Sequence, residues 1–288
     1  MTGAHALAAK RHRKAGRCGE EKDAHLGRKG IVTMKPWIVG NWKMNGSRKM
    51  VREYVPAFLD GLLESGELAA QVHVALCPPF PYLGEIASLL TSYPVRVGAQ
   101  NVNQHPNGYY TGEVSASMLS ELGITLCIVG HSERRHGHGE SNSLIGEKVT
   151  VLLAAGITPL VCIGETQAER DADDHQRVVE VQLESALRDL TAGAAPDILI
   201  GYEPVWAIGT GVNATPQQVE DMHGHIRGWL TGRFGTGEGA TIPILYGGSV
   251  TPENARALMS RPEVNGALVG GSSLKPDMFV SILKQSLS

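Results

Sequence analysis

The sequence predicts an α/β protein with a (β/α)8 barrel, in which eight parallel strands close on themselves inside a ring of outer helices. Short apolar runs recur along the chain, and segments with the helical spacing of apolar residues separate them. Residues 34–288 also fit the length of such a barrel, which has roughly 250 residues. A doubly wound open sheet alternates in the same way but usually has fewer strands. We therefore expect a single barrel domain.

Eight apolar runs are the predicted strands. Most are continuous rather than alternating, as expected of parallel strands that are covered on both faces. Parallel strands need crossover connections, so a helix should follow each run. The runs are Trp37–Gly40, Val72–Leu76, Val95–Ala99, Leu126–Gly130, Pro159–Ile163, Ile198–Tyr202, Ile242–Tyr246 and Asn265–Val269.

The predicted helices are recognised by their spacing and by their first residues. Apolar residues recur three and four positions apart over 50–62 and over 145–152. Thr215-Pro216 supplies a capping residue followed by proline at the first helical position, and Gln218 completes a capping box. Thr251-Pro252 repeats the pair. These signals predict helix starts at both prolines.

Composition narrows the class of function. Hydrophobic residues make up 42% and charged residues 19%, which indicates a globular chain with a sizeable core. The longest apolar runs fall far short of the roughly 20 residues that cross a bilayer, so we expect no membrane partner. The net charge of -3 argues against nucleic acid as a partner. Four widely spaced cysteines favour reduced thiols in a cytoplasmic enzyme over disulfides or a zinc site.

The first 33 residues differ from the rest. They carry eight Lys or Arg and only three Asp or Glu. The segment lacks the apolar core of a secretory signal and matches a transit peptide poorly. We expect a basic, disordered leader or an upstream start codon, with a single catalytic barrel over 34–288. A nucleic-acid-binding arm is the alternative.

Polar residues that follow the predicted strands are the catalytic candidates, because barrel enzymes use the loops after the carboxyl ends of strands. Lys43 follows the first run and could neutralise a phosphate or a developing oxyanion, although a solvated charge is the simpler interpretation. His131 follows the fourth run, and Ser132 is a natural N-cap. A helix starting there would disfavour the protonated ring, and a neutral imidazole can donate a hydrogen bond to a substrate oxygen.

Glu203 follows the sixth run, between an apolar strand and an apolar loop. Desolvation there is expected to raise the pKa of Glu203 towards that of a useful general base. The loop from Pro204 to Gly211 has a rigid proline at one end, apolar residues in the middle and glycines at the other end. It is predicted to be a lid that excludes water, with an ordinary apolar loop as the alternative.

Paired glycines follow the last two runs, Gly247-Gly248 and Gly270-Gly271. Loops after the seventh and eighth strands form the common phosphate site of barrels, so the two pairs together predict phosphate binding. Two histidine pairs, His136 with His138 and His223 with His225, lack further ligands at a metal-binding spacing. We expect these histidines to have surface or loop roles and predict no metal site.

Five strings of residues, in order and at the ends of predicted strands, resemble the triosephosphate isomerase family. The resemblance runs from about Met34 to the C-terminus, and the order of the five strings makes it specific. The strings occupy residues 41–46, 129–135, 202–211, 246–250 and 269–271.

The resemblance implies a TIM barrel that interconverts dihydroxyacetone phosphate and glyceraldehyde 3-phosphate, in glycolysis and gluconeogenesis, with no metal or cofactor. It implies that Glu203 is the base that moves a proton between C1 and C2 through an enediolate. His131 would be the neutral electrophile at the carbonyl group. Lys43 and Asn41 would stabilise the enediolate and orient the substrate, with Glu133 as a supporting carboxylate.

The resemblance also implies contacts outside the reacting carbons. The implied phosphate contacts, besides Asn41 and Lys43, are Gly209, Ser249, Gly270 and Gly271. The third loop of the family enters a neighbouring subunit, which implies a homodimer. Its ends are matched here by Gln100, Asn101 and Thr111.

Two other functions were weighed against the isomerase. A barrel aldolase needs a Schiff-base lysine at a strand end, typically the sixth, where this chain has Glu203. A catalytically idle phosphate-binding barrel could serve as an interaction protein through the basic leader. The presence of Glu203, His131 and Lys43 argues against that second alternative.

Overall fold

Eight parallel strands form the centre of the molecule. The computed structural model describes residues 24–26, 32–191, 197–209 and 213–287. The strands close into a barrel in the order β10-β3-β4-β5-β6-β7-β8-β9. Their bounds are β3 (Trp37–Asn41), β4 (His73–Cys77), β5 (Val95–Ala99), β6 (Leu126–Val129), β7 (Thr158–Ile163), β8 (Leu199–Tyr202), β9 (Ile244–Tyr246) and β10 (Gly266–Val269). All eight predicted runs are confirmed, with bounds that shift by no more than two residues.

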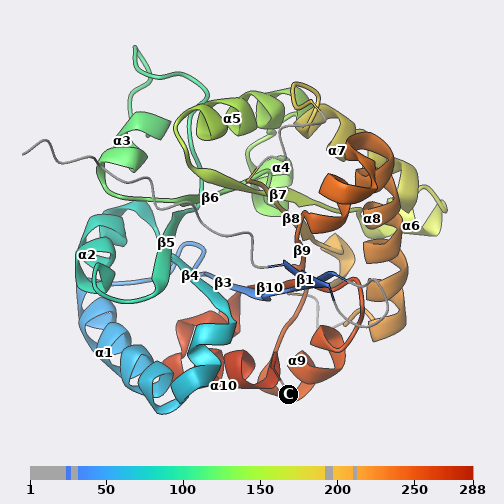
Figure 1. Ribbon diagram of the computed structural model, residues 1–288. Coiled ribbons are helices and arrows are strands. Elements are labelled where there is room, and N and C mark those ends of the chain that lie inside the picture. Colours follow the sequence, from blue (N-terminus) through green and yellow to red (C-terminus); the bar gives the residue numbers. More distant parts are fainter. Residues whose placement is uncertain (1–23, 27–31, 192–196, 210–212, 288) are drawn as a thin grey trace, which may run out of the picture.

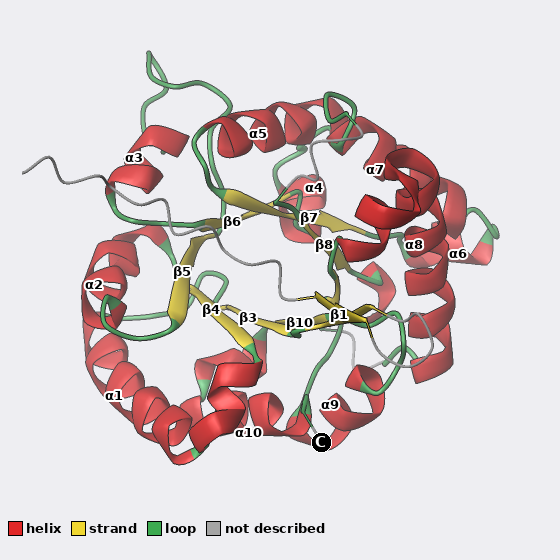
Figure 2. Ribbon diagram, in the orientation of Figure 1, coloured by secondary structure: helices red, strands yellow, loops and turns green. Residues whose placement is uncertain are grey.

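Helices surround the barrel on its outside (Figures 1 and 2). The predicted TIM barrel is therefore confirmed. The helices are α1 (Arg48–Glu64), α2 (Phe80–Leu90), α3 (Ala116–Glu121), α4 (Ser132–Gly137), α5 (Asn142–Ala154), α6 (Gln167–Asp171), α7 (His175–Ala186), α8 (Pro216–Glu238), α9 (Pro252–Met259) and α10 (Pro276–Gln285). No described helix is long and apolar enough to span a membrane.

Alternation along each strand explains why the runs are apolar throughout. One set of strand residues, such as Val39 and Ala75, forms a buried cluster inside the barrel. The intervening set, such as Ile38 and Val74, joins a second buried cluster with the inner faces of the helices. Because both faces of the sheet are covered, both sets must be apolar. The residues available for catalysis are therefore those in the loops that follow the carboxyl ends of the strands.

The predicted helix signals are also confirmed. The stripe over 50–62 is buried along α1. Helix α8 starts at Pro216 with Thr215 as N-cap, and the Gln218 backbone N–H donates to the Thr215 hydroxyl at 3.2 Å. Helix α9 starts in the same way, at Pro252 after the N-cap Thr251.

A short antiparallel pair precedes the barrel. It consists of β1 (Ala24–Leu26) and β2 (Val32–Met34), with Ala24 opposite Met34. The rest of the predicted basic leader, residues 1–23 and 27–31, lies outside the described residues. The division into a leader and a barrel at residue 34 stays a prediction.

Candidate active site

The carboxyl ends of the barrel strands bring the predicted polar residues together. Asn41 ends β3, His131 lies two residues after β6, and Glu203 directly follows β8. The His131 Nε2 atom lies 2.9 Å from Glu203 Oε1. Near His131, Lys43 Nζ donates to Glu133 Oε1 at 2.6 Å. Residues up to 90 positions apart in the chain thus meet because parallel strands end at one rim.

Glu203 is a buried carboxylate with little room around it. Its side chain is almost entirely covered, and the Ser132 backbone N–H donates to Oε2 at 2.8 Å. A methyl group on Gly247 would lie 2.8 Å from Glu203 Cγ, and one on Gly164 would overlap the Glu203 carbonyl oxygen. Gly247 therefore leaves space for the Glu203 side chain, and Gly164 leaves space for the Glu203 backbone.

His131 is itself the N-cap of α4, so the prediction that Ser132 caps this helix is wrong by one residue. Its Nδ1 atom accepts the backbone N–H of Glu133 at 3.2 Å. An imidazole nitrogen that accepts a hydrogen bond carries no proton, so the neutral ring has its proton on Nε2. That nitrogen faces Glu203. Histidine is an uncommon capping residue, which is why the sequence signal pointed to the serine.

The charge state of His131 depends on its carboxylate neighbours. Burial disfavours the charged ring, but Glu203 at 2.9 Å and Glu133 at 3.7 Å favour it more strongly. Together these effects raise the pKa of His131 above its ordinary value. The predicted effect of the helix end on the protonated ring stays a prediction, and the two carboxylates act in the opposite direction. The sequence could not show how closely Glu203 would face the imidazole.

Lys43 lies in a strained turn. Its φ of 51° is in the left-handed region, which a lysine rarely adopts. Two amide side chains hold the turn: the Lys43 N–H donates to Asn41 Oδ1 at 2.9 Å, and Gln100 Nε2 donates to the Lys43 carbonyl oxygen at 2.9 Å. Gln100 was predicted only as a dimer contact, and its position beneath Lys43 was missed. Its place directly after a strand was the available signal.

The two glycine loops adjoin Lys43. A methyl group on Gly270 would lie 3.5 Å from Lys43 Cε, so the loop after β10 passes beside the lysine side chain. The Ser272 hydroxyl donates to the Val250 carbonyl oxygen at 2.8 Å, which ties this loop to the one after β9. Ser249 and Gly271 lie in these joined loops. The predicted phosphate-binding loop after β10 therefore lies next to the Lys43 side chain.

The first half of the predicted lid is anchored to a buried carboxylate that the sequence analysis missed. The Val205 N–H donates to the Glu165 carbonyl oxygen at 3.0 Å. Three side chains donate to Glu165 Oε1, namely those of Trp206 at 2.8 Å, Arg170 at 2.9 Å and Tyr202 at 3.1 Å. Gly209 has a φ of 69°, and residues 210–212 lie outside the described residues. Glu165 follows β7, where a strand-end rule could have found it.

Comparison with known proteins supports the interpretation of these strand-end residues as an active site. The family model described as triosephosphate isomerase matches residues 36–286. The chain belongs to the triosephosphate isomerase family. It is 45% identical over 251 residues to triosephosphate isomerase of Rhodopirellula baltica, covering 87% of this chain and 97% of that protein. It is 46% identical over 248 residues to triosephosphate isomerase of Roseiflexus castenholzii, covering 86% and 96%.

Membership of the triosephosphate isomerase family confirms the predicted family and enzyme class. The reaction is the interconversion of dihydroxyacetone phosphate and glyceraldehyde 3-phosphate, an aldose-ketose isomerisation of glycolysis. The aldolase and the idle phosphate-binding barrel are therefore set aside. The roles of the individual side chains follow from their geometry and are proposed below.

The loop after β5, which the triosephosphate isomerase resemblance links to a partner subunit, projects from the body beside α3 (Figure 1). Asn101 at its base is buried, and its Oδ1 atom accepts from Lys148 Nζ at 2.8 Å. Thr111 is exposed near the tip, where Tyr109 is fully exposed. The loop therefore combines a fixed base with an exposed aromatic tip.

The two members of the histidine pair on α8, His223 and His225, have different surroundings. Among the described residues, no group of three or more His, Cys, Asp or Glu side chains is arranged to hold a metal ion. The His225 Nε2 atom lies 3.0 Å from Glu180 Oε1 on the outer helices. His223 is completely buried, and its Nδ1 atom lies 3.0 Å from the Glu263 carbonyl oxygen. The expected surface or loop role is wrong for His223, because α8 turns it towards Tyr202 and the barrel.

Proposed function

We propose that Glu203 and His131 carry out the proton transfers of the isomerisation. The Glu203 carboxylate removes a proton from C1 of dihydroxyacetone phosphate, and the electron pair moves to the carbonyl oxygen. His131, with its Nε2–H, donates a hydrogen bond to that oxygen as charge develops. The carboxylic acid formed on Glu203 returns its proton to C2, while the hydroxyl proton moves between the two oxygens through His131. No atom is gained or lost.

The convergence of these two groups supports the proposal most strongly. Glu203 and His131 are both buried, and their reacting atoms lie 2.9 Å apart at the rim where barrel enzymes act. A carboxylate that already contacts the imidazole must move towards the substrate carbon when the ligand enters between them. The neutral imidazole is then favoured, because the N–H donated to Nδ1 remains while the negative partner of Nε2 departs.

Lys43 and Asn41 are proposed to stabilise the enediolate and orient the substrate. The Lys43 ammonium supplies a positive charge beside the substrate oxygens. A preorganised charge at that place lowers the free energy needed to form the oxyanion of the transition state. Glu133 holds that ammonium at 2.6 Å in the absence of ligand, and Asn41 fixes its backbone. Glu133 is thus proposed as a positioning carboxylate.

Backbone groups of the glycine loops are proposed to bind the phosphate. These positions are Gly209, Ser249, Gly270 and Gly271. Phosphate binding would draw the lid over the substrate and exclude water, which protects the enediolate from losing phosphate. The hydrogen bond from Trp206 to the Glu165 carboxylate anchors the first half of the lid.

Steady-state kinetics of Glu203→Gln test the assignment of the base. The amide keeps the shape of the side chain but cannot accept the proton, so kcat is expected to fall about 10²–10⁴-fold with a smaller change in KM. Glu180→Gln is the matched control, since Glu180 lies on the outer face of α7 and should leave kcat unchanged. An unchanged kcat in Glu203→Gln would overturn the assignment.

We also propose a homodimer, on the basis of exposed apolar side chains near the active site. Three apolar side chains are unusually exposed near the projecting loop and the catalytic turn, namely Tyr109, Met44 and Met118. Apolar groups of this size favour a protein partner that covers them. Gln100, Asn101 and Thr111 lie along the loop that would dock. Tyr109→Asp should shift sedimentation towards the monomer, whereas an unshifted dimer would contradict this interface.

Two further proposals concern the cell and the chain ends. Cys77, Cys127 and Cys162 are buried free thiols, as expected of a reducing compartment, and they support a cytoplasmic location. The catalytic unit is proposed to be residues 34–288, since every proposed site residue follows Met34. Cell fractionation with an antibody to the chain tests the location.

A further inference from the structure

The side chain of Arg135, on α4, donates three hydrogen bonds to neutral oxygen atoms. Its Nε atom donates to the Gly130 carbonyl oxygen at 2.7 Å, one terminal nitrogen donates to Asn142 Oδ1 at 2.5 Å, and the other donates to the Cys162 carbonyl oxygen at 2.9 Å. These acceptors belong to the residue after β6, the first residue of α5, and β7. A guanidinium donates from a rigid, planar fork, so one side chain fixes three segments relative to one another.

Gly130 leaves the room that the guanidinium occupies. Its φ of 69° is in the left-handed region, and a methyl group there would lie 3.0 Å from Arg135 Nη2 and 3.1 Å from the Cys162 carbonyl oxygen. The pairing of β6 with β7 ends at Val129 and Val161. The guanidinium therefore bridges the two strands directly beyond their last paired residues.

Both carbonyl groups that the guanidinium contacts lead into the backbone of a group proposed to react. The Gly130 carbonyl group shares a planar peptide unit with the backbone nitrogen of His131. The Cys162 carbonyl group shares one with Ile163, whose own carbonyl oxygen accepts the Glu203 N–H at 2.7 Å. The fork therefore supports the backbone of the imidazole and the backbone of the carboxylate at the same time.

The charge of Arg135 also interacts with the proposed base. Burial lowers the pKa of Arg135, and the carboxylates of Glu203 and Glu140 oppose that effect. Glu140 already forms ion pairs with Arg134 and Lys148. Among the described residues, Glu203 forms no ion pair with a lysine or an arginine. Arg135 therefore acts on Glu203 through space as well as through the backbone.

We propose that Arg135 is a positioning residue of the isomerisation, which sets the approach of the His131 ring to the Glu203 carboxylate. The proposal rests on the proposed function, because it takes these two groups as the reacting pair. In the barrel, β7 lies between β6, which leads to His131, and β8, which leads to Glu203. The distance of 2.9 Å between the two side chains thus depends on how the ends of three strands are held.

Steady-state kinetics of Arg135→Ala, with and without millimolar guanidinium chloride, test the proposal. Loss of the fork lets both reacting groups shift, and a displacement of about 1 Å costs about 10²-fold, so kcat should fall by about that factor with a much smaller change in KM. Guanidinium ions that enter the vacated space should restore kcat several-fold. The same concentration of methylammonium should not, because it lacks the planar fork.

Arg135→Lys separates position from charge. Lysine keeps the positive charge but cannot hold three acceptors in one plane, so its kcat should also fall, by about tenfold or more. A wild-type kcat in Arg135→Lys would overturn the proposal, because the charge alone would then suffice. A loss in Arg135→Ala that guanidinium does not relieve would overturn it too, because it would indicate general damage to the fold.

A second pair of variants keeps the test decisive if the arginine variants fail to fold. Asn142→Ala removes one acceptor of the fork and leaves Arg135 in place, so kcat should fall several-fold at an unchanged KM. Asn142→Asp keeps an acceptor oxygen at the same position and should retain the wild-type kcat. Equal kcat values in the two Asn142 variants would overturn the proposal.

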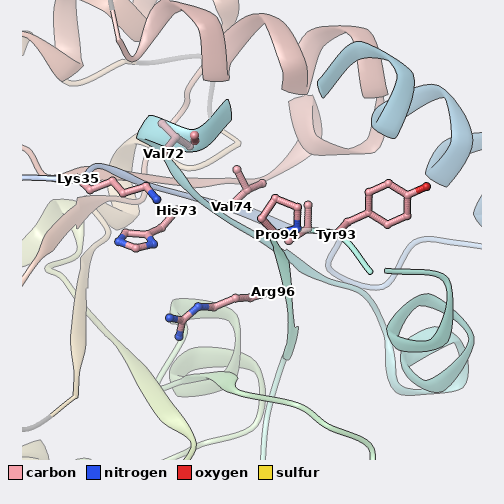
Figure 3. A pocket seen from close by; sticks show the side chains of 9 residues that line it. Lys35, Val72, His73, Val74, Tyr93, Pro94 and Arg96 are labelled. Atoms are coloured by element: carbon pink, nitrogen blue, oxygen red, sulfur yellow. The ribbon is translucent and has the colours of Figure 1, made fainter. Parts of the chain in front are cut away.

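The control variant lies at the opposite end of the barrel. A cavity of about 270 Å³ at the amino ends of β4 and β5 is lined by residues that include Lys35, His73 and Arg96 (Figure 3). Lys35 is a half-buried cation, as Arg135 is. Lys35→Ala should leave kcat unchanged, with or without guanidinium. An equal loss of kcat in Lys35→Ala would overturn the assignment, because any half-buried cation would then have the same effect.

Glu203→Gln distinguishes a failure of this proposal from a failure of the proposed function. An unchanged kcat in Glu203→Gln would remove the reacting pair, and the role of Arg135 would be lost with it. A fall in kcat in Glu203→Gln together with a wild-type kcat in Arg135→Ala would overturn the positioning role alone.

Discussion

Basic side chains have different neighbours at the two ends of the barrel. At the carboxyl end two basic side chains of the proposed site face carboxylates: Lys43 contacts Glu133, and His131 contacts Glu203. At the amino end the Arg96 and His73 side chains contact the aromatic ring of Trp37. Paired charges at the first end can separate when a substrate enters, which suits a reaction.

The carboxyl end of the barrel also contains strained backbone. The carboxyl end contains Lys43 with a positive φ and a carboxylate packed against glycines, and both features depend on surrounding hydrogen bonds. Among the described residues outside this rim, Asp173 is the only other non-glycine with positive φ. One of the two described non-glycine residues with positive φ therefore lies among the groups proposed to react.

The largest expected effect is a pH dependence of folding stability that comes from His223, which α8 packs against Tyr202 of the barrel. Burial lowers the pKa of His223 to about 4, whereas the unfolded chain has a histidine pKa near 6.5. The unfolded state thus binds the extra proton between these values, and stability falls as the pH falls from about 6.5 to 4. At about 1.4 kcal/mol per pH unit, this costs about 3 kcal/mol.

Urea unfolding across this pH range checks the effect. His223→Gln keeps a donor for the Glu263 carbonyl oxygen and should remove most of the pH dependence. His136→Gln, on the exposed part of α4, is the control and should retain it. A wild-type stability that does not decline more steeply than that of His223→Gln contradicts the buried neutral imidazole.

A change at Gly247 should break the carboxyl end alone. A methyl group there would lie 2.8 Å from Glu203 Cγ and displace the carboxylate. Misplacement of a reacting group by about 1 Å costs about 10²-fold in rate, so kcat/KM of Gly247→Ala should fall by that factor. Gly228→Ala on α8 has open space around it and should leave kcat/KM unchanged. Full activity in Gly247→Ala would show that Glu203 tolerates the shift.

His131 should show the opposite pH dependence to His223. Its folded pKa is raised, so the stabilisation by its carboxylate partners is complete below about pH 6.5 and disappears as the pH rises through the folded pKa. The difference in unfolding free energy between wild type and His131→Gln should therefore shrink from pH 6 to pH 9. A difference that grows with pH would place the Glu203 carboxylate away from the imidazole.

The sequence predicted the elements better than the contacts. Strands such as Leu126–Val129 follow directly from continuous apolar runs, because their burial is decided by local composition. Strand-end logic also found Glu203 and His131. What it missed depends on side chains meeting across the rim: the capping role of the His131 ring, the support of Lys43 by Gln100, and the Glu165 anchor of the lid.

Burial of a polar residue on a helix was equally hard to predict. His223 lies in a histidine pair that suggested a surface role, yet α8 packs it on Tyr202. Periodicity reports which positions are apolar, and a histidine on the buried face contributes nothing to that signal. The pocket around Arg96 was missed for a related reason, because it requires the register of three strands.

The smallest effect is expected at the other end of the chain. A chain that begins at Met34 loses the predicted leader and β1, but it keeps all of the residues proposed to bind substrate, the first of which is Asn41. The family match likewise starts at residue 36. Changes remote from a site usually alter energies by less than about 0.5 kcal/mol, so kcat/KM should stay within about twofold of the full chain. A larger fall in coupled assays with glyceraldehyde 3-phosphate would mean that the amino end acts on the carboxyl end through the barrel. The separation of the two ends would then be wrong, even with every rim contact intact.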